Sequence, residues 1–450
     1  GKVALTGSAY GNGMLYADVT NKSDKLTVKG YALGRSSYGK AYPTNASKMT
    51  DRALVENLHL NLDWKITNND RLFIKAYQKF ENTKQRITHL SPLTSPFSYT
   101  RFISLVLSYS HTFNNDAMLF AEIGADHTRT TSNGSHVGDT YPYGFIEFDT
   151  PLLTRDLWLM LGAEVDYENT WNIGQNRGQH TVSDFYVQLD YTHGPWVLTL
   201  GDRYRMMNYW YRQYDSEDHS LWTHQRNNHC YLASVGYKTG HHFLQALVAR
   251  RFFYPEISDF LVDETATTTD LKYDADSYST NLAHQGVLRY SYQQQNLTYH
   301  ASIEGNWYTH LPGPNKMQVA CRNSVYWKTG PWQLTLGANY YYQHVSADAT
   351  ASSDNDNFYT LKVAPALSLP HDLRLSATLL YSSRRTLEDQ HPHLFATVKA
   401  NKQLGKKCNL FAEFHDIAGY ATGNVSQLTG LYQNRALSIG ATIYPFRKNR

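Results

Sequence analysis

The sequence predicts an all-β transmembrane barrel, and three observations lead to that fold class. Segments with strict two-residue alternation recur from one end of the 450-residue chain to the other. The connections between them alternate between tight turns and longer polar loops. Aromatic residues make up 14% of the chain, although its mean hydropathy is −0.53. A barrel wall explains these observations together, because only every second residue faces lipid and aromatic girdles mark both membrane interfaces.

The alternation is clearest in the segment 297–306. Leu297, Tyr299, Ala301, Ile303 and Gly305 share one face, and every residue between them is polar. The segment 157–167 alternates less cleanly: one face carries leucine at 157, 159 and 161, and the other carries Trp158, Met160 and Gly162 before Glu164 and Asp166. A strand with one apolar and one wet face is half-buried, and repetition over 450 residues favours a barrel over a soluble sandwich.

Alternation and turn signals together predict about 22 antiparallel, up-and-down strands. No linker or composition break divides the chain, so we predict a single barrel domain over 1–450. The approximate spans of the strands, in chain order, are 2–10, 13–20, 25–36, 50–65, 71–84, 98–113, 117–130, 141–150, 157–171, 182–193, 196–211, 226–238, 242–254, 278–293, 295–309, 316–328, 331–346, 355–369, 372–386, 391–403, 406–417 and 432–446.

The turns after even-numbered strands are tight and rich in residues that tolerate or preset turn geometry. Examples in chain order are Asn21-Lys22-Ser23-Asp24, Thr67-Asn68-Asn69-Asp70, Asn114-Asn115-Asp116, Gly194-Pro195, Gly240, Gly330-Pro331 and Pro370-His371-Asp372. Most gaps after odd-numbered strands are longer, as at 255–277 and 418–431. Because outer-membrane barrels have short periplasmic turns and longer extracellular loops, we expect the tight turns and both termini to lie in the periplasm.

Composition argues against several other classes of protein. A net charge of +3 is too balanced for a nucleic-acid-binding chain. The cysteines, Cys230, Cys321 and Cys408, fall in predicted strands without metal-ligand spacing, so we interpret them as incidental thiols. No phosphate loop, nucleophile elbow or zinc-protease helix occurs, so we expect no enzyme, cofactor or metal. The soluble alternative is an aromatic-rich carbohydrate-binding sandwich or propeller.

The best candidate for ligand contact is the region 206–229, at a strand end and in the following loop. It contains aromatic and histidine side chains interspersed with carboxylates, which suits sugars, haem or peptides. An upper aromatic girdle followed by a solvated acidic loop is the alternative interpretation. The candidate contact residues are Tyr209, Trp210, Tyr211, Tyr214, His219, Trp222 and His224.

Alternation also predicts which charged residues face the lumen. They include Lys75, Lys79, Glu164, Asp166, Arg203, Arg205 and Glu304. Such inward faces fit contact with water or with a polar domain inside the barrel.

Four stretches resemble the barrel domain of TonB-dependent outer-membrane transporters of the Bacteroidetes type, which are proteins of Gram-negative bacteria. The first runs from Arg250 to Leu261 and is similar to an Arg-rich, Pro-containing mid-barrel signature. The second, from Lys406 to Ile417, resembles the penultimate strand, although Ala418 stands where the family has Phe. The third, 436–446, resembles the closing strand, which ends in an aromatic residue, but here residues 447–450 follow that aromatic. The fourth, 58–73, resembles an early hairpin of the barrel.

The resemblance implies active uptake of a bulky, scarce nutrient such as haem, a siderophore, a glycan or a peptide. Its implied partners are outer-membrane lipid, TonB and a plug domain that fills the lumen, together with a surface lipoprotein in some systems. The chain departs from the family pattern by starting at the strand 2–10, without a plug. Three explanations follow: the plug was trimmed, is a separate chain, or is lost.

The sequence also leaves two other functions open. A plugless barrel would act as a structural partner or docking platform in an outer-membrane complex. A passive porin would conduct small solutes, although porins usually have fewer strands.

Overall fold

The computed structural model describes residues 2–8, 13–41, 49–87, 97–132, 135–172, 177–212, 221–253, 281–309, 315–346, 354–383, 392–405, 407–415 and 436–444. All regular structure in these ranges is β-strand. The strands are β1 (Lys2–Ser8), β2 (Gly13–Lys22), β3 (Leu26–Ala41), β4 (Met49–Lys65), β5 (Asp70–Ile87), β6 (Phe97–Thr112), β7 (Met118–Ser132), β8 (Ser135–Pro151), β9 (Leu157–Asn172), β10 (Arg177–His193), β11 (Trp196–Arg212), β12 (Leu221–Thr239), β13 (His242–Phe253), β14 (Asn281–Gln294), β15 (Leu297–Thr309), β16 (Lys316–Thr329), β17 (Trp332–Val345), β18 (Asp354–Leu369), β19 (Leu373–Ser382), β20 (His393–Leu404), β21 (Cys408–His415) and β22 (Ala436–Ile443).

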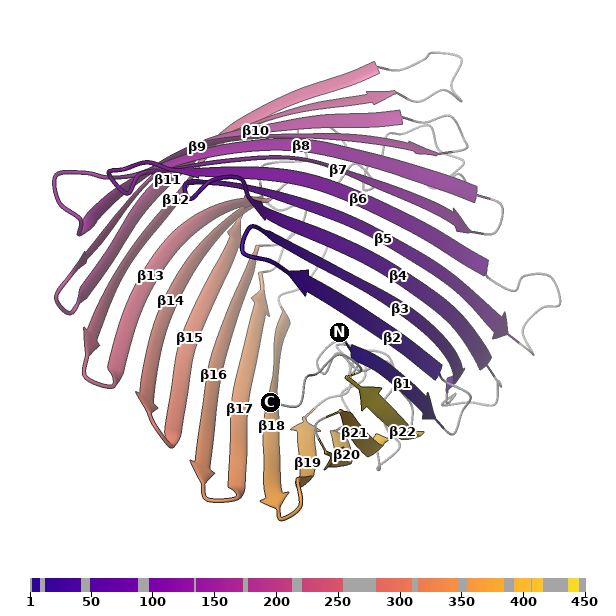
Figure 1. The fold of residues 1–450 in the computed structure, drawn as a ribbon. Coiled ribbons are helices and arrows are strands. Elements are labelled where there is room, and N and C mark those ends of the chain that lie inside the picture. The colour runs from indigo at the N-terminus through magenta and orange to yellow at the C-terminus, as the bar shows by residue number, and fades with distance from the viewer. Residues whose placement is uncertain are drawn as a thin grey trace.

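These strands form one closed antiparallel sheet, which confirms the predicted fold class and strand number. Every strand pairs with its neighbours in sequence, and β1 also pairs with β22, with Val3 opposite Ile443 and Ser8 opposite Ser438. Figure 1 shows β1 beside β22 at the seam. The ring leaves no sheet edge unpaired, which is the condition for a sheet to cross a membrane.

The turns at one end of the barrel are short and have the backbone geometry that their residues favour. Gly194, Gly240 and Gly330 adopt φ values of +55°, +53° and +52°. His371 and Asp372, in the turn between β18 and β19, have φ values of +61° and +57°. Because each of these turns joins an even strand to the next odd strand, the predicted alternation of tight turns is present in the structure.

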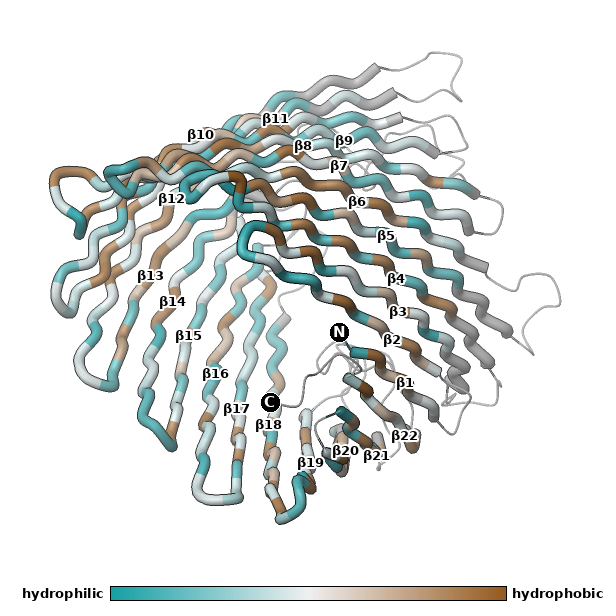
Figure 2. Tube along the Cα trace, in the orientation of Figure 1, coloured by the Kyte–Doolittle hydropathy of each residue, from teal (hydrophilic) through white to brown (hydrophobic). Residues whose placement is uncertain are grey.

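Alternate residues of each strand point away from the lumen and form an apolar outer band. Leu105, Ile123 and Leu200 are respectively 56%, 61% and 60% exposed on that surface. Figure 2 shows hydrophobic and hydrophilic residues alternating along β3 to β7. Near the tight turns, Trp196 and Tyr237 are register partners whose rings meet at 4.9 Å, consistent with an aromatic girdle. Among the described residues, no helix is long and apolar enough to cross a membrane.

The buried side chains lie on the lumen face rather than in a sandwiched core. Val106, Val182 and Met207 are buried, and each alternates with outward-facing residues of its strand. The three cysteines lie in β12, β16 and β21, as expected, and none of them forms a disulfide within the described residues. The long loops predicted at 255–277 and 418–431 lie outside the described residues.

Candidate functional site

The lumen face of β7 to β10 is lined with carboxylates. Their strands also carry Ile123, Ile146, Leu161 and Phe185 on the outer surface, and the carboxylates occupy the alternate positions that face inward. We call this set the acidic wall: Glu122, Asp126, Asp139, Glu147, Asp149, Glu164, Asp166, Glu168, Asp184 and Asp190. The inward positions 164 and 166 that alternation predicts are part of it.

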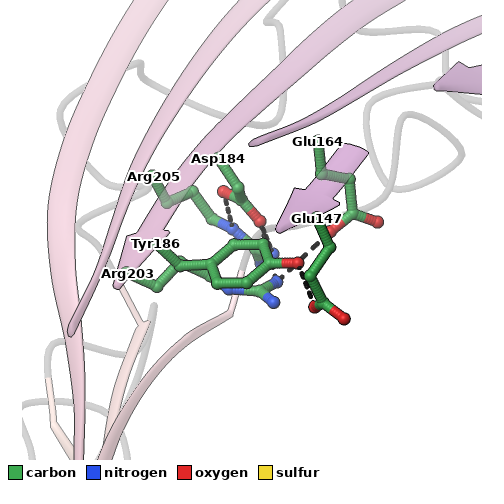
Figure 3. Close-up of polar contacts among 6 residues, drawn as sticks. All are labelled: Glu147, Glu164, Asp184, Tyr186, Arg203 and Arg205. Carbon is green, nitrogen blue, oxygen red and sulfur yellow. Dashed lines mark hydrogen bonds and ion pairs between the residues drawn. The ribbon is translucent and has the colours of Figure 1, made fainter. Parts of the chain in front are cut away.

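Asp184, on β10, is the most deeply buried member of the acidic wall. Its side chain is 0% exposed because two arginines of the next strand, β11, cover it. Arg203 Nη1 donates to Asp184 Oδ2 at 3.0 Å, and Arg205 Nε donates to Oδ1 at 2.7 Å. Arg205 Nη2 also donates to Oδ2. Figure 3 shows both guanidinium groups converging on this one carboxylate.

The same network extends to β8 and β9. Arg203 Nη1 also reaches Glu164 Oε2 at 3.4 Å, and its guanidinium carbon lies 4.9 Å from the centre of the Tyr186 ring. The Tyr186 hydroxyl donates to Glu147 Oε2 at 2.6 Å (Figure 3). Four strands are therefore joined by charged and aromatic side chains, and such charge-assisted bonds hold those side chains in fixed positions.

The absence of a side chain at Gly162 allows the Tyr186 ring to reach Glu147. Tyr186 lies flat over Gly162 of the neighbouring strand, and a Cβ added there would be 2.1 Å from Tyr186 Cζ. The ring can therefore cross β9 and present its hydroxyl to Glu147. Tyr143 repeats the arrangement over Gly124, where a Cβ would be 2.3 Å from Tyr143 Cζ, and its hydroxyl is 3.4 Å from Glu122 Oε1.

Near the loop end of the acidic wall, a histidine joins the hydrogen-bond network. His180 Nδ1 lies 2.8 Å from Glu168 Oε2, and both side chains are largely buried. The Thr170 hydroxyl is 3.2 Å from Glu168 Oε1 and 3.1 Å from Asp139 Oδ1. No set of three or more metal-ligating side chains forms a metal site within the described ranges.

Other parts of the lumen have a different charge balance. Lys75 and Lys79 face inward on β5, as predicted, and Lys79 pairs with Glu81 at 2.7 Å. We call a set of five inward-facing cations on β14 to β20 the basic wall: Arg289, Arg322, Lys362, Arg374 and Lys399. The lumen is therefore charge-segregated, with negative potential concentrated on one wall.

The predicted ligand-contact residues divide into three groups. The β11–β12 register pairs Tyr209 with His224 and Tyr211 with Trp222, so the backbone brings these positions together near the loop end. Trp210 pairs with Thr223 one position along, and alternation places it on the opposite face of the sheet. Tyr214 and His219 lie outside the described residues. A ligand role for this group stays a prediction.

Sequence reasoning missed the centre of the acidic wall. It identified Arg203 and Arg205 as inward-facing but did not identify Asp184, Tyr186 or Glu147 as their partners. Alternation assigns a face, whereas contacts across strands require the register, and the sequence did not provide that register. The signal that was available is Gly162, which interrupts the apolar first half of β9, because a strand glycine often marks close approach of another group.

No family model matches the chain, and no curated protein matches it in sequence. Several solved structures match its fold. They include the ferric-catecholate import receptor Fiu from E. coli K12, at a TM-score of 0.76 and 10% identity, covering 98% of this chain and 81% of that one. The FrpB iron transporter from Neisseria meningitidis gives a TM-score of 0.76 at 11% identity, with the same two coverages.

A third neighbour is the alcaligin outer-membrane receptor FauA from Bordetella pertussis, at a TM-score of 0.71 and 11% identity, covering 98% of this chain and 75% of that one. All three are named as receptors or transporters, and none as an enzyme. At this identity the likeness establishes the fold alone. The chain therefore has the fold of the 22-strand barrel found in outer-membrane iron and siderophore receptors.

Proposed function

We propose that this chain is the barrel domain of a TonB-dependent outer-membrane transporter of the Bacteroidetes type. The observation that carries the proposal is a closed 22-strand barrel whose lumen face carries a fully buried carboxylate, Asp184, held by ion pairs with Arg203 and Arg205. A barrel of this width normally contains a plug. The match of 98% of the chain to the fold of iron and siderophore receptors supports the same proposal.

The acidic wall is the surface on which a plug would rest. Its ten carboxylates face two guanidinium groups, those of Arg203 and Arg205, so the wall retains a large excess of negative charge. A basic face of a plug, in the same polypeptide or in another chain, would neutralise that excess. TonB, driven by the inner-membrane proton gradient, would then pull the plug and open a path for the ligand.

The substrate in this proposal is a bulky, scarce nutrient: haem, a siderophore, a glycan or a peptide. The names of the structural neighbours favour an iron carrier among these. The loop-end positions Tyr209, Tyr211, Trp222 and His224 are the ligand contacts we propose, and a surface lipoprotein would cover the same end. In this orientation the tight turns and both termini lie in the periplasm.

Uptake measurements test the proposal. Cells that carry the transporter in its native membrane should accumulate labelled ligand, and deletion of TonB or collapse of the proton gradient should abolish accumulation. Purified native protein in a planar bilayer should conduct little, because a plug blocks the lumen. Large, steady conductance together with TonB-independent uptake would contradict the proposal and favour a passive porin. A silent barrel that copurifies with a stable complex and transports nothing would favour a docking platform.

Charge reversal tests the plug contact separately. Glu147→Lys combined with Glu164→Lys should loosen a plug and raise bilayer conductance. Lys362→Glu, on the opposite wall, is the matched control and should leave conductance low. Equal conductance of both variants would contradict docking on the acidic wall.

A further inference from the structure

Two arginines face each other on the outside of the barrel. Arg101 on β6 is the direct register partner of Arg129 on β7, and both side chains are exposed. Their strand neighbours Leu105 and Ile123 belong to the apolar outer band, which places the arginines on the same outward face. Directly opposed residues have Cβ atoms about 4.5–5.5 Å apart, and like charges at that separation destabilise a sheet.

The described part of the chain provides no counter-ion for this pair. Neither arginine has an ion-pair partner among the described residues. The nearest carboxylate along the same outward row is Glu56 on β4, which pairs with Phe80 of β5, and Phe80 in turn pairs with Arg101. Glu56 is therefore two strands from Arg101, or about 9–10 Å. Within the described residues the two positive charges are therefore uncompensated, which leaves them available to an anion from outside the protein.

Their depth identifies where that anion would come from. Arg101 is the twelfth residue of β6 counted from its tight-turn end at Thr112, and Arg129 is the twelfth of β7 counted from Met118. A tilted strand crosses the hydrocarbon core in about 9–11 residues. Both arginines therefore lie just beyond the core, at the level of lipid headgroups, on the loop side of the membrane.

Aromatic side chains mark the same level independently. Phe80 and Tyr99, next to Arg101, meet edge to face at 4.8 Å. On the other side, Arg129 pairs with Gly138, and the Trp171 ring covers that glycine so closely that a Cβ would be 2.3 Å from Trp171 Cε2. Aromatic girdles occupy the membrane interfaces. The arginine pair is thus enclosed between aromatic groups in the interface itself.

We infer that Arg101 and Arg129 form a binding site for the phosphorylated headgroup of an outer-leaflet glycolipid. Guanidinium groups bind phosphate through paired, planar hydrogen bonds, and a phosphate between them would convert a repulsive contact into a bridged one. Phe80 and Trp171 would contact the upper acyl chains. This inference rests on the outer-membrane placement and orientation proposed above.

The experiment measures binding of fluorescent, bisphosphorylated lipid A to the purified barrel in detergent, with dephosphorylated lipid A and phosphatidylglycerol as comparisons. The wild type should prefer bisphosphorylated lipid A over both by at least about tenfold, which equals about 1.4 kcal/mol. Excess inorganic phosphate should compete weakly. Equal binding of the dephosphorylated lipid, of phosphatidylglycerol or of free phosphate would overturn the assignment without requiring any variant.

Substitution then identifies the residues. The double variant Arg101→Gln with Arg129→Gln should lose the preference, whereas Arg155→Gln, in an exposed turn at the opposite rim, should retain it. If the double variant does not fold, each single variant should lose part of the preference. Retained preference in the variants would overturn the assignment. Lipid binding in detergent requires neither TonB nor a plug. The lipid-binding result therefore holds even if the uptake experiment fails, and a failure to bind lipid A would not contradict TonB-dependent uptake.

Discussion

The acidic wall and the basic wall differ in how deeply their ion pairs are buried. On the basic wall, two of the five cations have a carboxylate partner among the described residues: Arg322 pairs with Glu304 at 2.9 Å, and Lys399 pairs with Glu413 of β21 at 3.0 Å, and these ion pairs stay partly hydrated. On the acidic wall, Asp184 is completely covered by two arginines, and the surrounding carboxylates are in excess. The ion pairs of the basic wall are therefore exposed and weak, whereas the acidic wall combines a buried ion pair with an excess of carboxylates, which the proposed plug would contact.

The largest expected effect comes from Asp184→Asn. The variant removes the one carboxylate that accepts from both Arg203 and Arg205, and because several charge-assisted hydrogen bonds are lost together we expect a loss of about 3–5 kcal/mol in the free energy of unfolding. Urea titration of the barrel in lipid vesicles, followed by tryptophan fluorescence, measures it. Glu304→Gln on the basic wall is the matched control and should lose about 1 kcal/mol or less. Equal losses in the two variants would remove the distinction between the walls.

The outer surface gives the second effect. Leu200 is exposed on the lipid face of β11, and Leu200→Arg should destabilise the folded barrel by about 2–4 kcal/mol if the site lies near the bilayer midplane. Thr199→Arg places the same charge one residue away on the lumen face, where Thr199 now contacts Asp190 at 2.7 Å, and it should fold almost normally. Folding yield in liposomes distinguishes the two, and similar yields would show that the assigned faces are wrong.

A smaller effect is expected from Gly162→Ala, which tests how the acidic wall is assembled. The new methyl group would displace the Tyr186 ring and break its bond to Glu147, at a cost of about 1–3 kcal/mol. Gly201→Ala is the control, because a Cβ there meets nothing closer than 3.5 Å. In a Tyr186→Leu background the stability lost through Gly162→Ala should be smaller. A penalty that persists unchanged would show that Tyr186 is not its cause.

The smallest effect lies outside both walls, at Asp70, the first residue of β5, next to the tight turn that precedes this strand. Asp70 accepts hydrogen bonds from Thr67 and Tyr109 and is bonded to His111, and these bonds hold the pKa of its carboxyl far below the ordinary value. A lowered pKa in the folded state adds stability at pH values above the ordinary pKa, near 4, and that stability declines as the pH falls. The stability difference between wild type and Asp70→Asn should therefore narrow from about pH 5 to pH 3. A constant difference would contradict this account.

The sequence predicted the turn end of the barrel better than the loop end. At the turn end, β10 was predicted to end at 193 and β11 to begin at 196, as observed. At the loop end, β8 begins at 135 rather than 141, and β12 at 221 rather than 226. Inside the membrane, one face meets lipid and the other meets water, so alternation is strong. Beyond the membrane both faces are wet, and the pattern fades although the hydrogen-bond ladder continues.

The candidate site shows the same limit. Alternation predicted that Glu164, Asp166, Arg203 and Arg205 face the lumen, and the register confirms it. The contacts of Asp184 with Arg203 and Arg205 depend on which residues are opposite one another on two neighbouring strands. Periodicity within one strand carries no such information. The arginine pair on the outer surface was missed for the same reason, since Arg101 and Arg129 are 28 positions apart in sequence and meet only through the β6–β7 register.

The closure of β1 on β22 has a consequence for the order of assembly. Every other pairing joins neighbouring strands, so hairpins can form and extend one after another along the chain. The seam instead joins Val3 to Ile443, and its two strands, of seven and eight residues, are among the shortest in the barrel. Closing so long a chain segment has a high entropic cost and gains few hydrogen bonds in return. The seam is therefore expected to form last, and until it does the growing sheet has two open edges that a membrane insertion factor must protect.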